Sequence, residues 1–358
     1  MKVKLQLKPK IPIKLVPVKA QTKTAQSVLA EAQTKTAQSV SADAQTLWTQ
    51  GVVVLPIFEQ KELIDWNHRF KKELIQFPEY KNPTLSTIFV YGAFGALGNP
   101  SSYHNLMVRD LRQKMMSIAH PLFNALEQVS GRTDKRLLEQ LFDRMCIRRA
   151  GTKTTAESWH RDIKGKLPET DDIFGGWINL DLDRTQYFSC IPGTHNEKGV
   201  KSGFAQIDPD KVDKTKKQIF SVPPGHWVVF YQQIIHEVIP RKMIADSYRV
   251  YLGFRLTASD QPLYDNKKII EDQGVPQLPG GMPAPVYAAR NVNFHLRQLI
   301  EWSQIFRSDL LETKKNKKSG NIYQIIPRFM KSLKECQLPL YPPYSNEEKK
   351  IMTPQLIN

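Results

Sequence analysis

Between Leu141 and Leu256 the chain consists of short runs of β-branched and aromatic residues, and this feature constrains its fold more than any other. Clusters of Gly, Pro, Asn and Asp separate the runs, as they separate strands in β proteins. The runs cover residues 144–149, 176–182, 188–191, 218–222, 227–231 and 248–256. Several short strands in succession favour a sandwich or jelly roll over a doubly wound sheet.

Helices are expected to precede these strands. Residues 51–56 read as a short buried strand, and residues 59–77 place apolar side chains at the three- and four-residue spacing of an amphipathic helix. A second helical pattern covers residues 108–128, where Pro121 is expected to kink or divide the helix. The prediction is a mainly β fold with flanking helices.

The two ends of the chain differ in composition from its centre. The segment AQTKTAQSV at residues 20–28 recurs at residues 32–40, and such a polar repeat cannot bury a core. Of the 16 excess positive charges, 11 lie in residues 1–50 and 311–350. These basic ends are either solvated tails or surfaces that bind phosphates or an acidic partner.

These observations divide the chain into three parts. Residues 1–46 are predicted to form a basic, repeat-containing low-complexity tail, and residues 47–262 a folded domain. Residues 263–358 are predicted to contain a Pro/Gly loop, a helix near residues 291–311 and a basic, Pro-rich tail.

Cysteine usage and hydropathy bear on the location of the protein. The three cysteines lie far apart and form no CxxC pair, which is typical of a reducing compartment. Lys and Pro interrupt every apolar run of the first 19 residues, so no signal-peptide core is expected there. No run elsewhere approaches the roughly 20 apolar residues of a membrane span. An intracellular, cytoplasmic protein is the expectation.

The sequence SWHRDIK provides a candidate metal site. His160 and Asp162 are two residues apart, so their side chains project to the same side of an extended segment. His236, at the end of a predicted β run, is the candidate third ligand. Two imidazoles and one carboxylate form the facial triad of non-haem Fe(II) oxygenases. A Zn(II) hydrolase could use the same residues, so the triad alone leaves the metal open.

The other histidines have no partner at ligand spacing. His226 opens a predicted strand, where a turn or packing role is expected. The remaining five are expected to be structural or exposed: His68, His104, His120, His195 and His295.

With these neighbouring motifs, the chain resembles the phytanoyl-CoA dioxygenase-like (PhyH) family of Fe(II)- and 2-oxoglutarate-dependent oxygenases. Five segments match family elements in the same order: residues 51–59, 148–162, 176–182, 191–195 and 225–236. They match, in turn, the opening strand and helix, the HxD element, the next strand, the PGTH turn and the distal-histidine segment. The resemblance implies a double-stranded β-helix, a cupin-like jelly roll, and makes residues 47–262 the oxygenase domain.

The resemblance also implies a basic residue after the distal histidine that pairs with the far carboxylate of 2-oxoglutarate. Arg249, 13 residues beyond His236, is the natural match. Arg255 is the runner-up, because six residues along a strand return to the same face. A planar guanidinium suits this role because it can hold a carboxylate through two hydrogen bonds. Arg241, in the loop after His236, is expected to face solvent.

The implied reaction converts 2-oxoglutarate to succinate and hydroxylates a substrate, with ascorbate as a reductant. Related halogenases lack the carboxylate ligand, so Asp162 favours hydroxylation or its demethylating and desaturating variants. His226 and Glu237 depart from the family pattern, so the substrate of a known family member does not transfer to this chain. The expected substrate is a small molecule or a lipid-like compound, and it could be an anion. The alternative is a non-catalytic binding or structural protein on the same fold, whose basic tails bind nucleic acid or an acidic partner.

Overall fold

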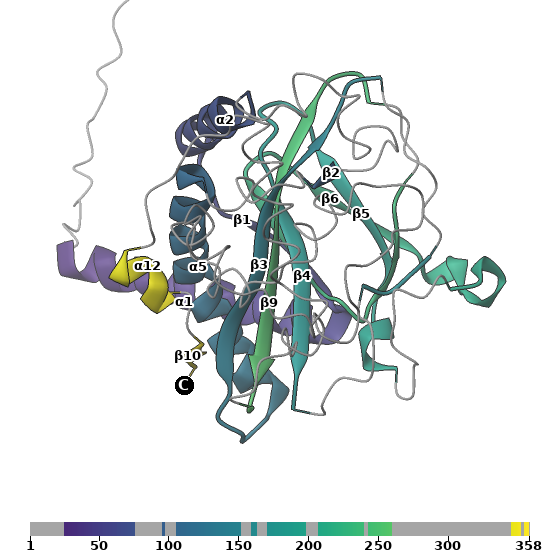
Figure 1. The fold of residues 1–358 in the computed structure, drawn as a ribbon. Coiled ribbons are helices and arrows are strands. Elements are labelled where there is room, and N and C mark those ends of the chain that lie inside the picture. The colour runs from purple at the N-terminus through teal and green to yellow at the C-terminus, as the bar shows by residue number, and fades with distance from the viewer. Residues whose placement is uncertain are drawn as a thin grey trace, which may run out of the picture. The chain divides into compact units, whose positions relative to one another are not determined.

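The computed structural model describes residues 25–75, 95–96, 105–151, 159–162, 170–197, 207–239, 243–259, 345–351 and 354–357. The chain forms two compact units, residues 1–39 and residues 40–358, and the sheets belong to the second (Figure 1). Within the described ranges, no helix combines the length and apolar character that crossing a bilayer requires. The predicted helix near residues 291–311 and the Pro/Gly loop lie outside the described residues.

The described residues up to Ser130 contain three helices: α1 (Ala25–Gln50), α2 (Gln60–Leu74) and α5 (Leu106–Ser130). Helix α2 buries the apolar stripe that its spacing predicted, including Leu63 and Phe70. Helix α5 begins at Asn105, whose side chain accepts a hydrogen bond from the Val108 N–H at 2.9 Å. It ends at Gly131, whose left-handed backbone conformation suits glycine.

Helix α5 is not divided at Pro121, contrary to one of the two outcomes expected from the sequence. Proline removes the N–H that would bond to the carbonyl four residues earlier, that of Ser117. Both residues are exposed, so water can solvate that carbonyl. Leu122 and Phe123, which follow directly, are buried and hold the helix against the core.

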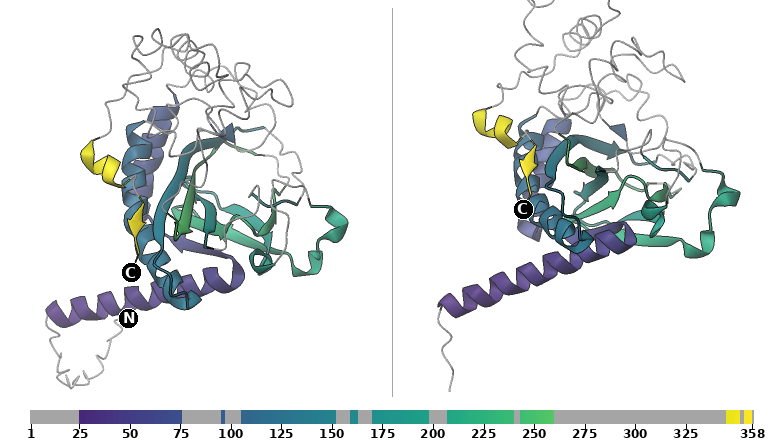
Figure 2. Two further views of the ribbon diagram at one scale, coloured as in Figure 1. Left: turned by 60° about the horizontal axis from the view of Figure 1, so that its bottom comes forward. Right: turned by 90° about the horizontal axis from the view of Figure 1, so that it is seen from below.

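The major sheet is antiparallel and seven-stranded, with the order β1-β7-β4-β9-β3-β10 and β2 paired to β3. Its strands are β1 (Val52–Pro56), β2 (Gly95–Ala96), β3 (Leu137–Arg148), β4 (Asp172–Asn179), β7 (His226–Tyr231), β9 (Ser247–Thr257) and β10 (Gln355–Leu356). Helices α2 and α5 cover one face of it, as Figure 2 shows. Buried residues from both helices and from the sheet form one large apolar core there.

The minor sheet covers the opposite face of the major sheet. It has the order β6-β5-β8, with β5 (Gln186–Ile191), β6 (Gln218–Val222) and β8 (Ile235–Glu237). A second apolar cluster lies between the sheets and includes Trp177 and Phe230 of the major sheet and Phe188 of the minor sheet. Two antiparallel sheets packed in this way form a double-stranded β-helix, which confirms the predicted fold class.

Residues from both ends of the chain take part in the helix-side core. Ala44 of α1 and Ile357, after β10, belong to it, and both lie outside residues 47–262. Helix α12 (Asn346–Ile351) contacts α5, where Glu348 pairs with Arg109 through two hydrogen bonds of 2.5 and 2.6 Å. This C-terminal segment therefore packs on the domain.

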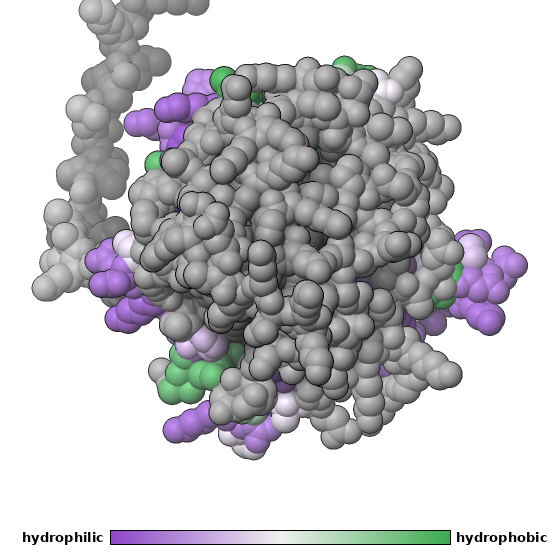
Figure 3. All heavy atoms as spheres, viewed as in Figure 1, coloured by the Kyte–Doolittle hydropathy of each residue, from purple (hydrophilic) through white to green (hydrophobic). Residues whose placement is uncertain are grey.

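A lysine-rich segment projects from the fold before β6. It consists of two short 3-10 helices, η4 (Pro209–Lys211) and η5 (Lys214–Lys216). Figure 3 shows this segment, on the right, as strongly hydrophilic. Its lysines are exposed, as a solvated turn requires.

Candidate metal centre

Two neighbouring backbone segments bring the predicted metal ligands together. His160 and His236 exchange both backbone hydrogen bonds, at 2.9 and 3.0 Å, and the Asp162 N–H donates to the Gln232 carbonyl at 2.9 Å. Strand β8 in turn pairs His236 with Cys190 of β5. The HxD segment thus lies alongside the distal-histidine segment at the edge of the minor sheet.

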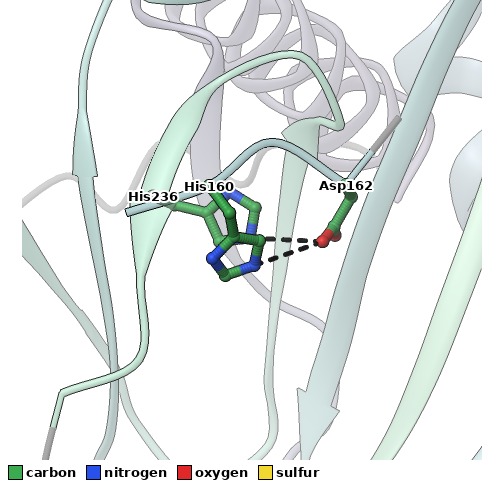
Figure 4. Close-up of side chains that lie close together, drawn as sticks. All are labelled: His160, Asp162 and His236. Atoms are coloured by element: carbon green, nitrogen blue, oxygen red, sulfur yellow. Dashed lines mark ion pairs between the residues drawn. The ribbon is translucent and has the colours of Figure 1, made fainter. Parts of the chain in front are cut away.

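The three side chains converge, as Figure 4 shows. The Nε2 atoms of His160 and His236 each lie 3.5 Å from Oδ1 of Asp162. All three candidate ligand atoms lie within 4.8 Å of one another, and the two imidazole centroids are 4.2 Å apart. One ion at about 2.0–2.2 Å from each donor fits this spacing.

The tautomer of His236 also suits a metal ligand. Its Nδ1 lies 3.0 Å from the Ile234 carbonyl, which accepts a hydrogen bond and thereby places the ring proton on Nδ1. With a metal bound, Nε2 would then present its lone pair to the ion. A histidine that binds a metal usually donates its other N–H to a carbonyl or carboxylate in this way.

Asp162 is the anionic member of the group. Partial burial alone would raise the pKa of this carboxyl, but the facing imidazoles of His236 and His160 outweigh burial and hold the pKa well below its usual range. The carboxylate is therefore ionised at neutral pH. Its other oxygen, Oδ2, accepts a hydrogen bond of 2.9 Å from the hydroxyl of Tyr251 on β9.

Aromatic side chains surround the histidine pair. The rings of Phe188 and Phe230 lie 5.4 and 5.2 Å from the His236 ring, centroid to centroid. The Trp177 ring contacts both phenylalanines edge-on. This wall excludes water from one side of the group and strengthens its electrostatic interactions.

Arg161, between the two candidate ligands in sequence, points the other way and holds the segment in place. Its guanidinium donates to the carbonyls of Thr194, at 2.8 Å, and of Gln233, and to the Glu197 carboxylate at 2.5 Å. The PGTH turn, which contains Thr194, is thus tied to both ligand segments. Sequence reasoning assigned no role to Arg161, because its partners are distant in sequence.

Arg249 lies on β9 on the same face of the strand as Tyr251, two residues or about 7 Å away. Its guanidinium lies over the Trp177 ring, 4.2 Å from the centroid. Burial, reinforced by the nearby Arg148, lowers the pKa of Arg249 to about 9. A bound carboxylate would offset this cost by neutralising the guanidinium.

Arg255 shares the inner face of β9 but belongs to a different cluster. Its guanidinium bonds to Asp171 at 2.7 and 2.8 Å and to Glu139 at 3.3 Å, and all three residues are buried. It lies about 20 Å along the strand from Arg249. Two carboxylates already neutralise its charge, so the runner-up position is structural.

Replacing Arg255 by methionine is expected to lower the free energy of unfolding by about 3–5 kcal/mol, because it leaves two buried carboxylates without their cation. Urea denaturation would measure the loss. Arg69→Met, which removes an exposed ion pair to Asp110, is the matched control and should cost less than about 1 kcal/mol. A loss for Arg255→Met no larger than that of the control would contradict this reading.

His195 and His226 take structural positions, and His68 is exposed. His195 is buried, stacks on Tyr231 at 4.5 Å and bonds to the Trp48 carbonyl at 3.0 Å. A Cβ at Gly51 would come within 2.3 Å of its ring, so only glycine fits beside it. His226 bonds to the Pro224 carbonyl in the turn before β7. Arg241 lies outside the described residues.

Comparison with known proteins finds similarity in solved structures only: no protein-family model and no curated protein matches the sequence. The non-haem α-ketoglutarate-dependent carbocyclase SnoK from nogalamycin biosynthesis is 15% identical, with a TM-score of 0.42 over 60% of this chain and 83% of that one. EctD from S. alaskensis with bound Fe is 14% identical, with a TM-score of 0.40 over 59% and 74%. EvdO2 from Micromonospora carbonacea var. aurantiaca, complexed with 2-oxoglutarate, is 16% identical, with a TM-score of 0.38 over 62% and 93%.

Proposed function

We propose that this chain is an Fe(II)- and 2-oxoglutarate-dependent oxygenase that hydroxylates its substrate. The observation that carries the proposal is the convergence of His160, Asp162 and His236 on one point. Two imidazoles and one carboxylate are the donor set of the facial triad. The opposite face of an octahedral ion held in this way stays open to a co-substrate and to O2.

The residues present fit the iron and its co-substrate. His160 and His236 would bind the metal through Nε2, and Asp162 would bind it through Oδ1. When bound, iron and 2-oxoglutarate supply the oxidising power, drawn from O2 and from the conversion of 2-oxoglutarate to succinate. The protein holds these groups in place and keeps water out.

Arg249 would bind the far carboxylate of 2-oxoglutarate. A continuous series of contacts connects it to the metal ligands: Arg249 lies over Trp177, Trp177 contacts Phe188, and Phe188 contacts His236. Its two-residue separation from Tyr251, which bonds to Asp162, is comparable to the span of a five-carbon dicarboxylate. The guanidinium lies over the Trp177 ring, and its planar fork suits a carboxylate partner.

The substrate is proposed to be a small molecule or a lipid-like acid, in a phytanoyl-CoA dioxygenase-like enzyme that uses ascorbate as a reductant. The two described cysteines, Cys146 and Cys190, are buried and form no disulfide within the described residues, which supports a reducing cytoplasmic location. The basic ends of the chain would contact an acidic partner or nucleic acid rather than the reacting substrate.

Calorimetric titration with Mn(II), which replaces Fe(II) without oxidising in air, separates the oxygenase from its alternatives. An oxygenase is expected to bind Mn(II) and to bind 2-oxoglutarate only once the metal is present. A zinc hydrolase would bind Zn(II) with no effect of 2-oxoglutarate. A non-catalytic scaffold would bind neither Mn(II) nor 2-oxoglutarate, and that result would refute the proposal.

A further inference from the structure

The side chain of Tyr251 meets the metal-binding carboxylate from the side away from the histidines. Its hydroxyl donates to Oδ2 of Asp162 at 2.9 Å, whereas Oδ1 lies 3.5 Å from both imidazole Nε2 atoms. The two oxygens of one carboxylate therefore have different surroundings. Oδ1 faces the position of the ion, and Oδ2 faces a phenol.

The surrounding sheet leaves room for this phenol. Tyr251 pairs with Trp177 across β9 and β4, and Gly175 lies two residues before Trp177 on the same face. A Cβ at Gly175 would come within 2.7 Å of the Tyr251 hydroxyl. Glycine at this position leaves the space through which the Tyr251 hydroxyl reaches Asp162. Strand β4 therefore helps to position the Tyr251 side chain.

This arrangement has a consequence for the metal. A carboxylate can bind an ion through one oxygen or through both. An ion bound by both oxygens of Asp162 would lose one of the positions that 2-oxoglutarate and O2 require. A hydrogen bond to Oδ2 favours binding through Oδ1 alone, because chelation would break that bond.

We propose that Tyr251 is a positioning residue that restricts Asp162 to binding the metal through one oxygen and so keeps a coordination position open. The inference rests on the proposed metal site. Its hydroxyl acts through Asp162, and Gly175 leaves the space that this hydroxyl occupies.

Tyr251→Phe tests this proposal with the smallest possible change. The number of exchangeable waters on bound Mn(II) is measured from the broadening of its magnetic resonance lines in ¹⁷O-enriched water. The variant is expected to hold one water fewer than the wild type, because the released Oδ2 takes that position.

Tyr231→Phe is the matched control. Its hydroxyl is buried and has no hydrogen-bond partner among the described residues, and its ring faces the helix-side core rather than the metal. This variant is expected to keep the wild-type number of waters. Gly175→Ala is a second test variant, because the added methyl displaces the Tyr251 hydroxyl without removing it. Mn(II) bound to this variant should also carry one exchangeable water fewer than in the wild type.

The outcomes separate this inference from the proposed function. The first requirement is that the wild type binds Mn(II) and that His160→Ala abolishes this binding. If the wild type does not bind Mn(II), the metal site itself is refuted. If the wild type binds Mn(II) but Tyr251→Phe and Gly175→Ala hold as many exchangeable waters as the wild type, the metal site stands and the role of Tyr251 is refuted.

Discussion

Replacing Asp162 by alanine is expected to weaken Mn(II) binding by at least about 100-fold, more than the loss of an outer partner of a ligand would. Asp162 is the one anionic ligand of the proposed triad, and its carboxylate oxygen lies 3.5 Å from both imidazole nitrogens. Without it, two neutral imidazoles would remain to hold a divalent ion. Isothermal titration with Mn(II) would measure the effect.

Asp183→Ala is the matched control for this prediction. The Asp183 side chain is 78% exposed and makes no contact closer than 4.0 Å with its cationic neighbour Arg184. Its removal changes the net charge by the same amount and should leave Mn(II) affinity unchanged. Equal affinities for Asp162→Ala and the wild type would show that the metal binds elsewhere.

Replacing Arg249 by methionine is expected to weaken 2-oxoglutarate binding to the Mn(II)-loaded protein by about 30-fold or more. Truncating one partner of a buried, hydrogen-bonded charge pair costs about 2–5 kcal/mol, and each 1.4 kcal/mol is a factor of about ten. Arg249→Lys keeps the charge but loses the planar fork. Its affinity for 2-oxoglutarate should therefore lie between those of the wild type and Arg249→Met. Mn(II) affinity should not change, because Arg249 is not a ligand.

Arg69→Met is the control for Arg249→Met. Arg69 also stacks on a tryptophan, with its guanidinium 4.5 Å from the Trp66 ring centroid, but it lies on the partly exposed surface of α2. The comparison therefore separates loss of a cation stacked on an aromatic ring from loss of the proposed carboxylate partner. Unaltered 2-oxoglutarate affinity in Arg249→Met would exclude the assigned role.

The elements with strong local patterns were predictable from the sequence. Strands β6 and β7 and helix α2 lie within a few residues of their predicted bounds. A run of β-branched and aromatic residues between turn residues, or a three- and four-residue apolar stripe, encodes them locally. Strands β2 and β8 have two and three residues and carry no such pattern. They exist because neighbouring strands supply their hydrogen bonds, which is tertiary information.

The candidate site, too, was predictable from the sequence only in part. The two-residue spacing of His160 and Asp162 is local, but only the fold shows that His236 exchanges backbone hydrogen bonds with His160. Alternation places Arg249, Tyr251 and Arg255 on one face of β9. Which of them contacts Asp162, and which pairs with buried carboxylates, depends on the neighbouring strands.

The C-terminal segment shows the limit of reasoning from composition. Residues 311–350 carry excess positive charge, and the sequence favoured a basic tail. Yet Glu348 pairs with the buried Arg109 of α5, and Ile357 is 4% exposed in the helix-side core. Individual residues make these contacts. The net charge of a whole segment does not indicate which of its residues pack on the domain.

The most direct test of the metal and co-substrate assignment is succinate formation from 2-oxoglutarate by purified protein with Fe(II), O2 and ascorbate, without added substrate. We expect slow succinate formation by the wild type and by His68→Ala, which replaces an exposed histidine on α2, and none by His160→Ala. Equal succinate formation by His160→Ala, or none by the wild type together with no binding of 2-oxoglutarate to the Mn(II)-loaded protein, would contradict this assignment.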